Sequence, residues 1–158
     1  MTRKEFTAEV LKAEKSLYHI AKSILRDDED CADAMQNAIL QAYSKLNTLK
    51  NEAFFKTWLT RILINESYQI VRSRKIQVPY EDYMEEQTCS SFEGYSEVYL
   101  AVNELPELYR IPFVLHYVEG YSVKETGQIL KLSDSAVKVR LHRARNLMKE
   151  KLKGEYGL

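Results

Sequence analysis

Glycine, proline and cysteine are all scarce in this sequence, and their scarcity excludes several classes of protein. Five glycines and three prolines among 158 residues favour helices over turn-rich β architectures. Cys31 and Cys89 are too few and too far apart for a disulfide framework or a zinc site. The three histidines are scattered along the chain. We therefore expect no metal and no cofactor.

Long hydrophobic runs are also missing. No apolar stretch approaches the roughly 20 residues that a bilayer-spanning helix needs, and no apolar stretch follows the charged N-terminal residues, so no secretory signal is predicted. Hydrophobic residues nevertheless make up 45% of the chain, enough for packed cores. The sequence therefore predicts a folded protein that stays in the cytoplasm.

The chain lacks an excess of charge of either sign. Its formal net charge is zero, which argues against a simple basic nucleic-acid binder, but the charge is unevenly distributed. Residues 76–96 contain five acidic and no basic side chains, and the blocks on either side are mildly basic. We predict one domain over residues 1–76, a linker over 77–96 and a second domain over 97–158. Pro79, Gly94 and the absence of a hydrophobic period favour a flexible linker, although its C-terminal half fits a partly ordered surface loop equally well.

Helical periodicity dominates both blocks and predicts an all-α fold with two small helical domains. The first block should contain helices from about Lys4 to Leu25, Asp30 to Leu46 and Ala53 to Arg74. Its second helix has an apolar stripe of Met35, Ile39, Ala42 and Leu46, and we expect that stripe to pack in the core.

The second block has the pattern of a helix-turn-helix. Because Pro112 should not lie inside a helix, we expect a turn and then a helix that begins near Ile111. Ser122 and Glu125 form a capping box for a short helix to Leu130. Lys131 and Leu132 form a turn, with Lys131 where glycine is common, and Ser133 caps a long basic helix to about Lys153.

That last helix has two opposite faces. Val137, Leu141, Ala144 and Met148 form an apolar stripe. The opposite arc offers donors for phosphates and base edges, and Val139 offers a methyl contact for thymine. A solvated basic face is the alternative interpretation, which the short capped helix directly before it makes less attractive. The arc contains Ser135, Lys138, Val139, His142, Arg143 and Arg145.

The helix over 53–74 combines a core stripe, Leu59, Leu63 and Ile70, with an opposite stripe of rings, amides and cations. Rings stack on unpaired bases, amides read base edges, and guanidinium groups hold phosphates. Burial of Trp58 and Tyr68 against the first helix is the alternative for those two residues. The opposite stripe contains Phe54, Trp58, Arg61, Asn65, Tyr68, Gln69 and Arg72, and Arg74 and Lys75 extend its charge.

Two groups of segments, in this order, are similar to a known family. Residues Asp33 to Tyr43 and Phe55 to Asn65 resemble region 2 of the extracytoplasmic-function (ECF) sigma factors of bacterial RNA polymerase. Three segments in the second block, 105–120, 122–130 and 137–145, resemble region 4 of the same family. The resemblance covers nearly the whole chain apart from the linker and the extreme ends.

The resemblance implies roles for individual residues. Asp33, Gln36, Asn37 and Leu40 would dock on the coiled coil of the largest polymerase subunit, with Asn37 at a position that is usually Glu. At the −10 element the resemblance implies Trp58, Arg61 and Asn65, with Asn65 and the loop 47–53 holding a flipped base. The stripe on the same helix adds Tyr68 and Arg72 to this group. At the −35 element the resemblance implies Lys138, Arg140, His142 and Arg143, and the basic arc adds Ser135. Because Arg140 flanks the core stripe, we expect it to contact phosphate rather than bases.

The resemblance also implies partners. Core RNA polymerase would bind through its coiled coil and its flap, promoter DNA would bind both regions, and a membrane-anchored anti-sigma factor would hold the protein inactive. No small-molecule substrate and no catalytic site are expected. A stand-alone helix-turn-helix regulator is the alternative, and it would bind duplex DNA tightly without polymerase. An enzyme such as a nuclease would need clustered metal-binding carboxylates, whereas the acids here lie in a turn and in the linker.

Overall fold

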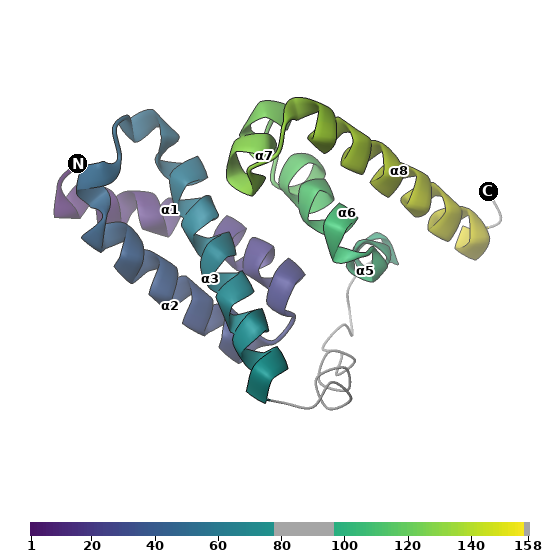
Figure 1. The fold of residues 1–158 in the computed structure, drawn as a ribbon, viewed down its shortest axis with the longest axis horizontal. Helices are drawn as coiled ribbons and strands as arrows, with labels where there is room; N and C mark the ends of the chain where they lie inside the picture. Colours follow the sequence, from purple (N-terminus) through teal and green to yellow (C-terminus); the bar gives the residue numbers. More distant parts are fainter. Residues whose placement is uncertain (78–96, 157–158) are drawn as a thin grey trace. The chain divides into compact units, whose positions relative to one another are not determined.

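The computed structural model describes residues 1–77 and 97–156, and within these ranges every regular element is a helix (Figure 1). The predicted all-α architecture is therefore confirmed. The chain divides into two compact units, Met1–Cys89 and Ser90–Leu158, and each is described by itself. The predicted linker, 77–96, lies almost entirely outside the described residues, so its bounds remain a prediction.

The first unit consists of three long helices, α1, α2 and α3, which all pack against one another. Two short 3₁₀ turns, η1 and η2, join α2 to α3. In order, the elements are α1 (Arg3–Leu25), α2 (Asp28–Ser44), η1 (Leu46–Thr48), η2 (Glu52–Phe54) and α3 (Phe55–Gln77).

Local caps fix where α1 and α2 begin and end. Thr2 and Glu5 form a capping box at the start of α1, and Arg26 ends this helix in the left-handed conformation, at φ 66°. The side chain of Asp27 then accepts a hydrogen bond from the Asp30 backbone. Because Asp27 caps α2, the turn is shorter than predicted and α2 begins at Asp28 rather than at Asp30.

The core face of α2 differs from the predicted one. Ala34, Ala38 and Ala42 are buried, whereas Met35 and Ile39 are only half-buried. Since α2 lies against both α1 and α3, small side chains at the contact let the helix axes approach closely. The predicted stripe is therefore correct at Ala42 and wrong at Met35 and Ile39, and Leu46 lies beyond the end of α2, in η1. In the predicted core stripe of α3, Leu59 and Leu63 are fully buried, whereas Ile70 is half-buried.

The second unit contains four α-helices and one π-helical turn, η3, within the described residues. The long helix α8 contacts α5, α6 and α7, so it forms the centre of this unit. In order, the elements are α5 (Glu97–Glu104), α6 (Glu107–Phe113), η3 (Val114–Val118), α7 (Val123–Leu130) and α8 (Asp134–Tyr156).

The helix α6 begins at Glu107, four residues earlier than predicted, and contains Pro112. The hydrogen bond that Pro112 cannot make is one to Leu108, in the exposed first turn of α6, where the loss costs least. The chain then passes directly into the π-helical turn η3. Inserted turns of this kind are frequent at functional sites.

The predicted helix-turn-helix is confirmed in its local details. Ser122 and Glu125 form the capping box of α7, and Lys131 ends α7 in the left-handed conformation, at φ 58°. The Ser133 hydroxyl accepts a hydrogen bond from the Ala136 backbone at 3.2 Å. A close approach that the sequence did not reveal lies at Gly127, where a Cβ would stand 2.6 Å from the Leu132 carbonyl oxygen.

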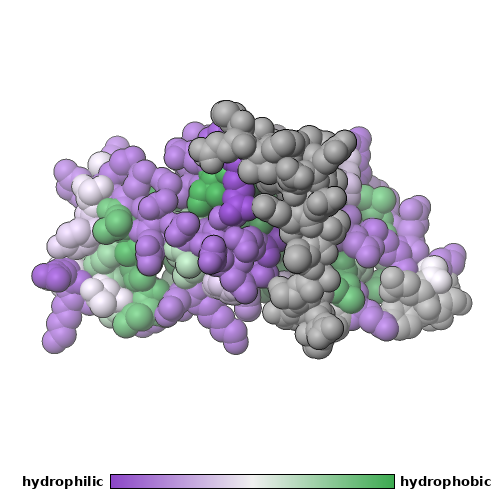
Figure 2. All heavy atoms as spheres, turned by 90° about the horizontal axis from the view of Figure 1, so that it is seen from below, coloured by the Kyte–Doolittle hydropathy of each residue, from purple (hydrophilic) through white to green (hydrophobic). Residues whose placement is uncertain are grey.

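The predicted apolar stripe of α8 is confirmed, since Val137, Leu141, Ala144 and Met148 are all buried. Ala144 and Met148 belong to a core cluster with Ala101, Val102, Leu105 and Val114. The face of the molecule in Figure 2 is predominantly hydrophilic, with hydrophobic atoms in separate patches. No helix among the described residues is both long and apolar enough to cross a membrane.

Candidate nucleic-acid and polymerase interfaces

The outer face of α3 carries the residues predicted to capture unpaired DNA. Arg61, Asn65 and Arg72 are exposed, and Trp58 and Tyr68 are half-buried. Their spacing of three or four residues places all five along one side of the helix. The rings are thus supported by the protein on one side and accessible on the other.

A row of aromatic rings supports Trp58 from beneath. The Trp58 ring lies 5.9 Å from that of Phe55, between ring centroids, and Phe55 meets Phe6 of α1 edge-on at 5.6 Å. Phe6 in turn meets Tyr43 of α2 at 5.3 Å. Phe6 and Phe55 are buried, whereas Tyr43 is 49% exposed. This row connects α1, α2 and α3, and its packing fixes one edge of the predicted base-capturing face.

The loop between α2 and α3 ends in a local cap at Asn51. The side chain of Asn51 accepts a hydrogen bond from the Ala53 backbone at 3.0 Å. Phe54, predicted to lie on the helix, is the last residue of η2, immediately before α3, and is 56% exposed. The predicted flipped-base loop, residues 47–53, therefore leads directly into the aromatic end of α3.

The face of α2 predicted to bind polymerase is solvent-accessible along its length. Asp33, Gln36 and Asn37 are exposed, and Leu40 is 69% exposed. At the flank of this face, the Gln41 side-chain amide donates to the buried carboxylate of Glu66 at 2.5 Å. Since Glu66 adjoins Asn65 on α3, this bond ties the predicted polymerase face to the predicted DNA face.

An ion-pair network closes the opposite end of the first unit. Lys22 bonds to Asp28 at 2.6 Å, and the Tyr18 hydroxyl also donates to Asp28. These hydrogen bonds, first that from Lys22, hold the pKa of Asp28 below its ordinary value. Arg74 of α3 pairs with Asp30 at 2.6 Å. Burial raises the pKa of the Asp30 carboxyl, and the charge of Arg74 opposes that rise.

This network changes what was expected of two residues. The prediction that Arg74 extends the positive face of α3 was wrong, because its guanidinium is engaged with Asp30. Burial raises the pKa of the Cys31 thiol to about 12, so this cysteine is neutral at physiological pH and is a poor nucleophile or metal ligand. Among the described residues, no group of acidic, histidine or cysteine side chains is arranged to hold a metal ion.

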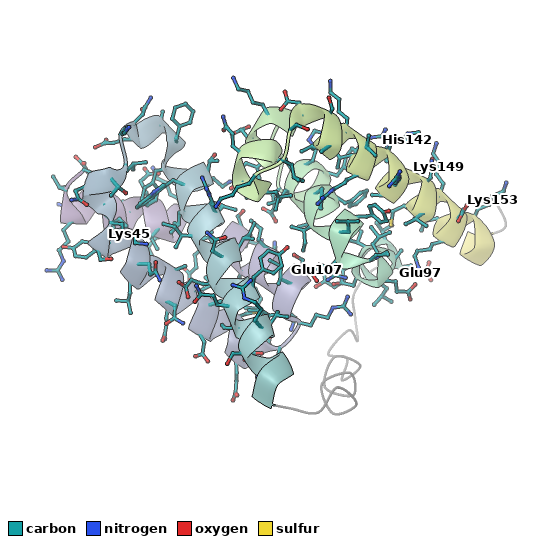
Figure 3. The ribbon with its side chains drawn as sticks, in the orientation of Figure 1. Lys45, Glu97, Glu107, His142, Lys149 and Lys153 are labelled. Carbon is teal, nitrogen blue, oxygen red and sulfur yellow. The ribbon has the colours of Figure 1, made fainter. Side chains whose placement is uncertain are left out.

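The outer face of α8 is basic and accessible. Ser135, Lys138, His142 and Arg143 are exposed, and Arg140 is half-buried beside the core stripe, as its place on the helix predicts. Asn146 and the Nε2 atom of His142 lie 3.3 Å apart. Figure 3 shows His142, Lys149 and Lys153 projecting from α8 further along the helix. This arrangement presents several donors on a rigid rod, as recognition of a DNA groove requires.

Comparison with known proteins gives the same two regions. The family model for sigma-70 region 2 matches residues 10–76, and the model for sigma-70, region 4 matches residues 95–148. The chain is 28% identical over 144 residues to the RNA polymerase sigma factor SigV of Bacillus subtilis, covering 89% of this chain and 87% of the relative. It is 31% identical over 134 residues to the ECF RNA polymerase sigma factor SigM of Mycobacterium tuberculosis, covering 83% of this chain and 68% of the relative.

Solved structures have the same fold. The sigma factor RpoE in complex with the anti-sigma factor NepR, from Bartonella quintana, matches with a TM-score of 0.79 and 26% identity, covering 95% of this chain and 98% of that one. A second structure, CnrH in complex with the cytosolic domain of CnrY, matches with a TM-score of 0.73 and 23% identity, covering 97% of this chain and 90% of that one. At that identity the second match concerns the fold alone.

Proposed function

The chain belongs to the ECF sigma factors of the sigma-70 family, and we propose that its two units read the two elements of a promoter by different chemistry. It is an RNA polymerase sigma factor, so it binds core polymerase and directs initiation at promoters. In our proposal, α8 reads the duplex −35 element and α3 captures the melted −10 element.

One observation carries this proposal: the two exposed helix faces differ in the kinds of side chain that they present. The α3 face combines the rings of Trp58 and Tyr68 with the amide of Asn65, and stacking on a ring stabilises an unpaired base by about 1–3 kcal/mol. The α8 face presents Lys138 and Arg143, with short Ser135 near its start, which suits phosphates and the base edges of a duplex.

The melting step needs no catalytic group in this chain. Capture of unstacked bases by Trp58 and Asn65 would stabilise the open state relative to the duplex, and the population of open promoter would rise accordingly. Arg61 and Arg72 would hold the strand by its phosphates. The polymerase would perform all chemistry, and we propose no cofactor, no metal and no small-molecule substrate for this subunit.

The polymerase would be engaged through both units. Asp33, Gln36, Asn37 and Leu40 form a polar face with one prominent apolar side chain, which fits a rimmed protein contact with the coiled coil of the largest subunit. The second unit would contact the flap. Because the chain has no net charge, the free protein should bind duplex DNA weakly, which disfavours the stand-alone regulator.

Regulation by a protein inhibitor is part of the proposal. One matched structure contains the sigma factor RpoE in complex with NepR, which is named as an anti-sigma factor. We propose that an anti-sigma factor, anchored in the membrane, holds this chain inactive in the cytoplasm until a signal releases it.

Asn65→Ala tests the base-capture role. The variant removes an exposed amide and leaves the buried positions Leu59 and Leu63 intact, so core binding and helicity should persist. Open-complex formation should fall by about tenfold, as expected for loss of roughly 1–3 kcal/mol of base-edge contacts. A template with a mismatch bubble across the −10 element should largely restore it, because the unpairing cost has been removed.

The measurement is permanganate reactivity of thymines on duplex and bubble templates, with circular dichroism as the folding check. Ser73→Ala, at an exposed polar position of α3 outside the predicted base-capturing stripe, is the control for helix stability and should open duplex promoters like the parent. Normal duplex opening by Asn65→Ala would exclude the base-capture role, and a loss of helicity would make Asn65 structural.

A further inference from the structure

Tyr117 and Arg145 form a contact between η3 and α8 that none of the roles above uses. The Nη1 atom of Arg145 donates to the Tyr117 hydroxyl at 2.6 Å, between residues 28 positions apart. Both side chains are exposed, Tyr117 by 45%. A hydrogen bond between two long exposed side chains costs conformational entropy, so its presence on the basic face of α8 calls for a physical reason.

The π-helical turn and two ring contacts hold Tyr117 in place. Its ring lies 4.9 Å from that of Phe113 and 4.7 Å from that of His116, and Phe113 packs against the core cluster of the second unit. The Nδ1 atom of His116 is 2.7 Å from the Tyr121 carbonyl oxygen. The phenol is therefore a preorganised acceptor, and Arg145 is the side chain that it directs.

The contact orients Arg145 without neutralising its charge. The neighbours of Arg145 at three and four positions along α8 are Leu141, His142, Met148 and Lys149, and none of these is acidic. Tyr117 is a neutral acceptor that occupies one of the five guanidinium N–H groups. Arg74, by contrast, is paired with the carboxylates of Asp27 and Asp30. Arg145 thus retains a full charge and free donors in a restrained orientation.

The position of Arg145 indicates what it would bind. It follows Lys138 by seven residues and His142 by three, so it lies on the same face about 10 Å further along α8 than Lys138. When the N-terminal part of a recognition helix enters the major groove, its later turns pass the groove edge, where phosphates rather than bases are within reach.

We propose that Arg145 binds a backbone phosphate at the edge of the −35 duplex and that Tyr117 is its positioning residue. The proposal rests on the proposed role of α8 in binding the −35 element. It adds η3, which does not belong to the helix-turn-helix itself, to the residues that set affinity for DNA. A phosphate contact carries no sequence information, so the pair should affect affinity equally on all promoters.

The test uses holoenzyme and a double-stranded −35 fragment, with fluorescence anisotropy measured over a range of salt concentrations. Arg145→Ala should lower affinity about five- to tenfold at low salt and reduce the slope of log K against log salt by about 0.9, the amount expected for one lost phosphate contact. Tyr117→Phe keeps the ring and removes only the acceptor. It should lower affinity by about two- to threefold with the slope nearly unchanged, because the charge remains but is less well oriented.

The double variant is the decisive control. In the Arg145→Ala background, Tyr117→Phe should have no further effect, since the side chain that it positions is gone. Additive losses, or an unchanged affinity of Tyr117→Phe alone, would overturn the positioning role. A change of base preference in Arg145→Ala would overturn phosphate binding, as would weaker binding of core polymerase without DNA, which would assign the pair to a protein interface.

Lys138→Ala separates failure of this inference from failure of the proposed function. If Lys138→Ala weakens −35 binding and Arg145→Ala does not, only the Tyr117–Arg145 inference is wrong. If neither variant weakens binding, the outer face of α8 does not bind this element, and both proposals fail.

Discussion

The helices α3 and α8 are both 23 residues long. In α8 the residues that form the core and those proposed to bind DNA are separate, whereas in α3 they are in contact. The core stripe of α8 is apolar, with Val137, Leu141, Ala144 and Met148 buried, and its basic side chains take no part in it. The helix α3 buries polar Thr60, Glu66 and Ser67 as well, and the predicted base-stacking ring, Trp58, is packed against the core residue Phe55.

This difference follows from the two kinds of DNA that the helices are proposed to bind. A duplex offers a regular surface of phosphates and base edges, for which cations on a rigid helix suffice. An unpaired base has to be held by its face and its edge, which requires rings and amides placed accurately by the protein beneath them. Substitutions on α3 should therefore disturb folding and recognition together more often than substitutions on α8.

The largest expected effects come from the two cores. Leu63→Ala in α3 and Leu141→Ala in α8 each remove a fully or almost fully buried side chain and should destabilise their own unit by about 2–5 kcal/mol. We expect Leu63→Ala to increase amide hydrogen exchange in α1–α3 while α5–α8 keep their protection, and Leu141→Ala to do the reverse. Loss of protection in both units from either variant would show that they fold as one cooperative body.

The hydrophobic period predicted α8 closely because one strongly apolar stripe there decides the packing. The sequence also predicted the capping roles of Ser122, Glu125 and Ser133 correctly. A capping residue bonds to a backbone group within three positions of itself, so its role depends on local sequence alone. For the same reason the face with Lys138, His142 and Arg143 was identified correctly as exposed. Local chemistry and periodicity are sufficient where neighbouring residues determine the structure.

The sequence was a poorer guide where distant residues decide the outcome. The apolar period of α2 placed Met35 and Ile39 in the core, whereas contact with two helices selects the smaller Ala34 and Ala38. Neither the Phe6–Phe55 contact nor the Tyr117–Arg145 bond leaves a local signal, because their partners lie far apart in the chain. Charge alone could not reveal that Arg74 is paired with Asp30.

Among substitutions on the proposed DNA-binding face of α8, Lys138→Ala should have the larger effect on promoter binding. Lys138 is exposed at the centre of the α8 face, so the variant should fold normally, weaken promoter binding by about 1–3 kcal/mol and relax preference at one or two −35 positions. Arg140→Ala, at the edge of the core stripe, should weaken binding by less and leave sequence preference unchanged. Binding of a promoter library by each holoenzyme measures both. Parental behaviour by both variants would show that the α8 face is wrongly assigned.

A smaller effect is expected for the Arg74–Asp30 pair, which has no counterpart in the α8 stripe. Arg74→Met should destabilise the first unit by about 1–2 kcal/mol at neutral pH, because it leaves the buried Asp30 carboxylate without its nearest cation. The Arg74 side chain is 31% exposed, so the loss of stability should be smaller than for a fully buried pair.

The pH dependence of this loss distinguishes an electrostatic cause from lost packing. Burial already raises the pKa of Asp30 above its ordinary 3.8, and removing Arg74 should raise it further. A carboxyl with a raised pKa disfavours folding when ionised, so the loss should be full at neutral pH. The loss of stability caused by Arg74→Met should shrink as the pH falls through the raised pKa of Asp30, and it should be smallest below 3.8. Urea unfolding at pH 7 and pH 4 measures it, and an equal loss at both values would indicate packing.

The smallest expected effect uses a feature that the two units share. A non-glycine residue in the left-handed conformation follows one helix in each unit: Arg26, at φ 66°, follows α1, and Lys131, at φ 58°, follows α7. Glycine adopts this conformation without the steric cost of a Cβ. Lys131 is exposed, so Lys131→Gly should stabilise the second unit by about 0.5–1 kcal/mol.

Arg26→Gly is the matched variant, and it should gain less or lose stability. Arg26 is half-buried, and glycine cannot replace the packing of its side chain, so the relief of backbone strain is offset. Thermal unfolding of both variants, followed by circular dichroism, measures the difference. Equal stabilisation by the two glycines would mean that the side chain of Arg26 contributes nothing to the corner between α1 and α2. Destabilisation by Lys131→Gly would mean that the extra freedom of glycine in the unfolded chain outweighs the strain at this turn.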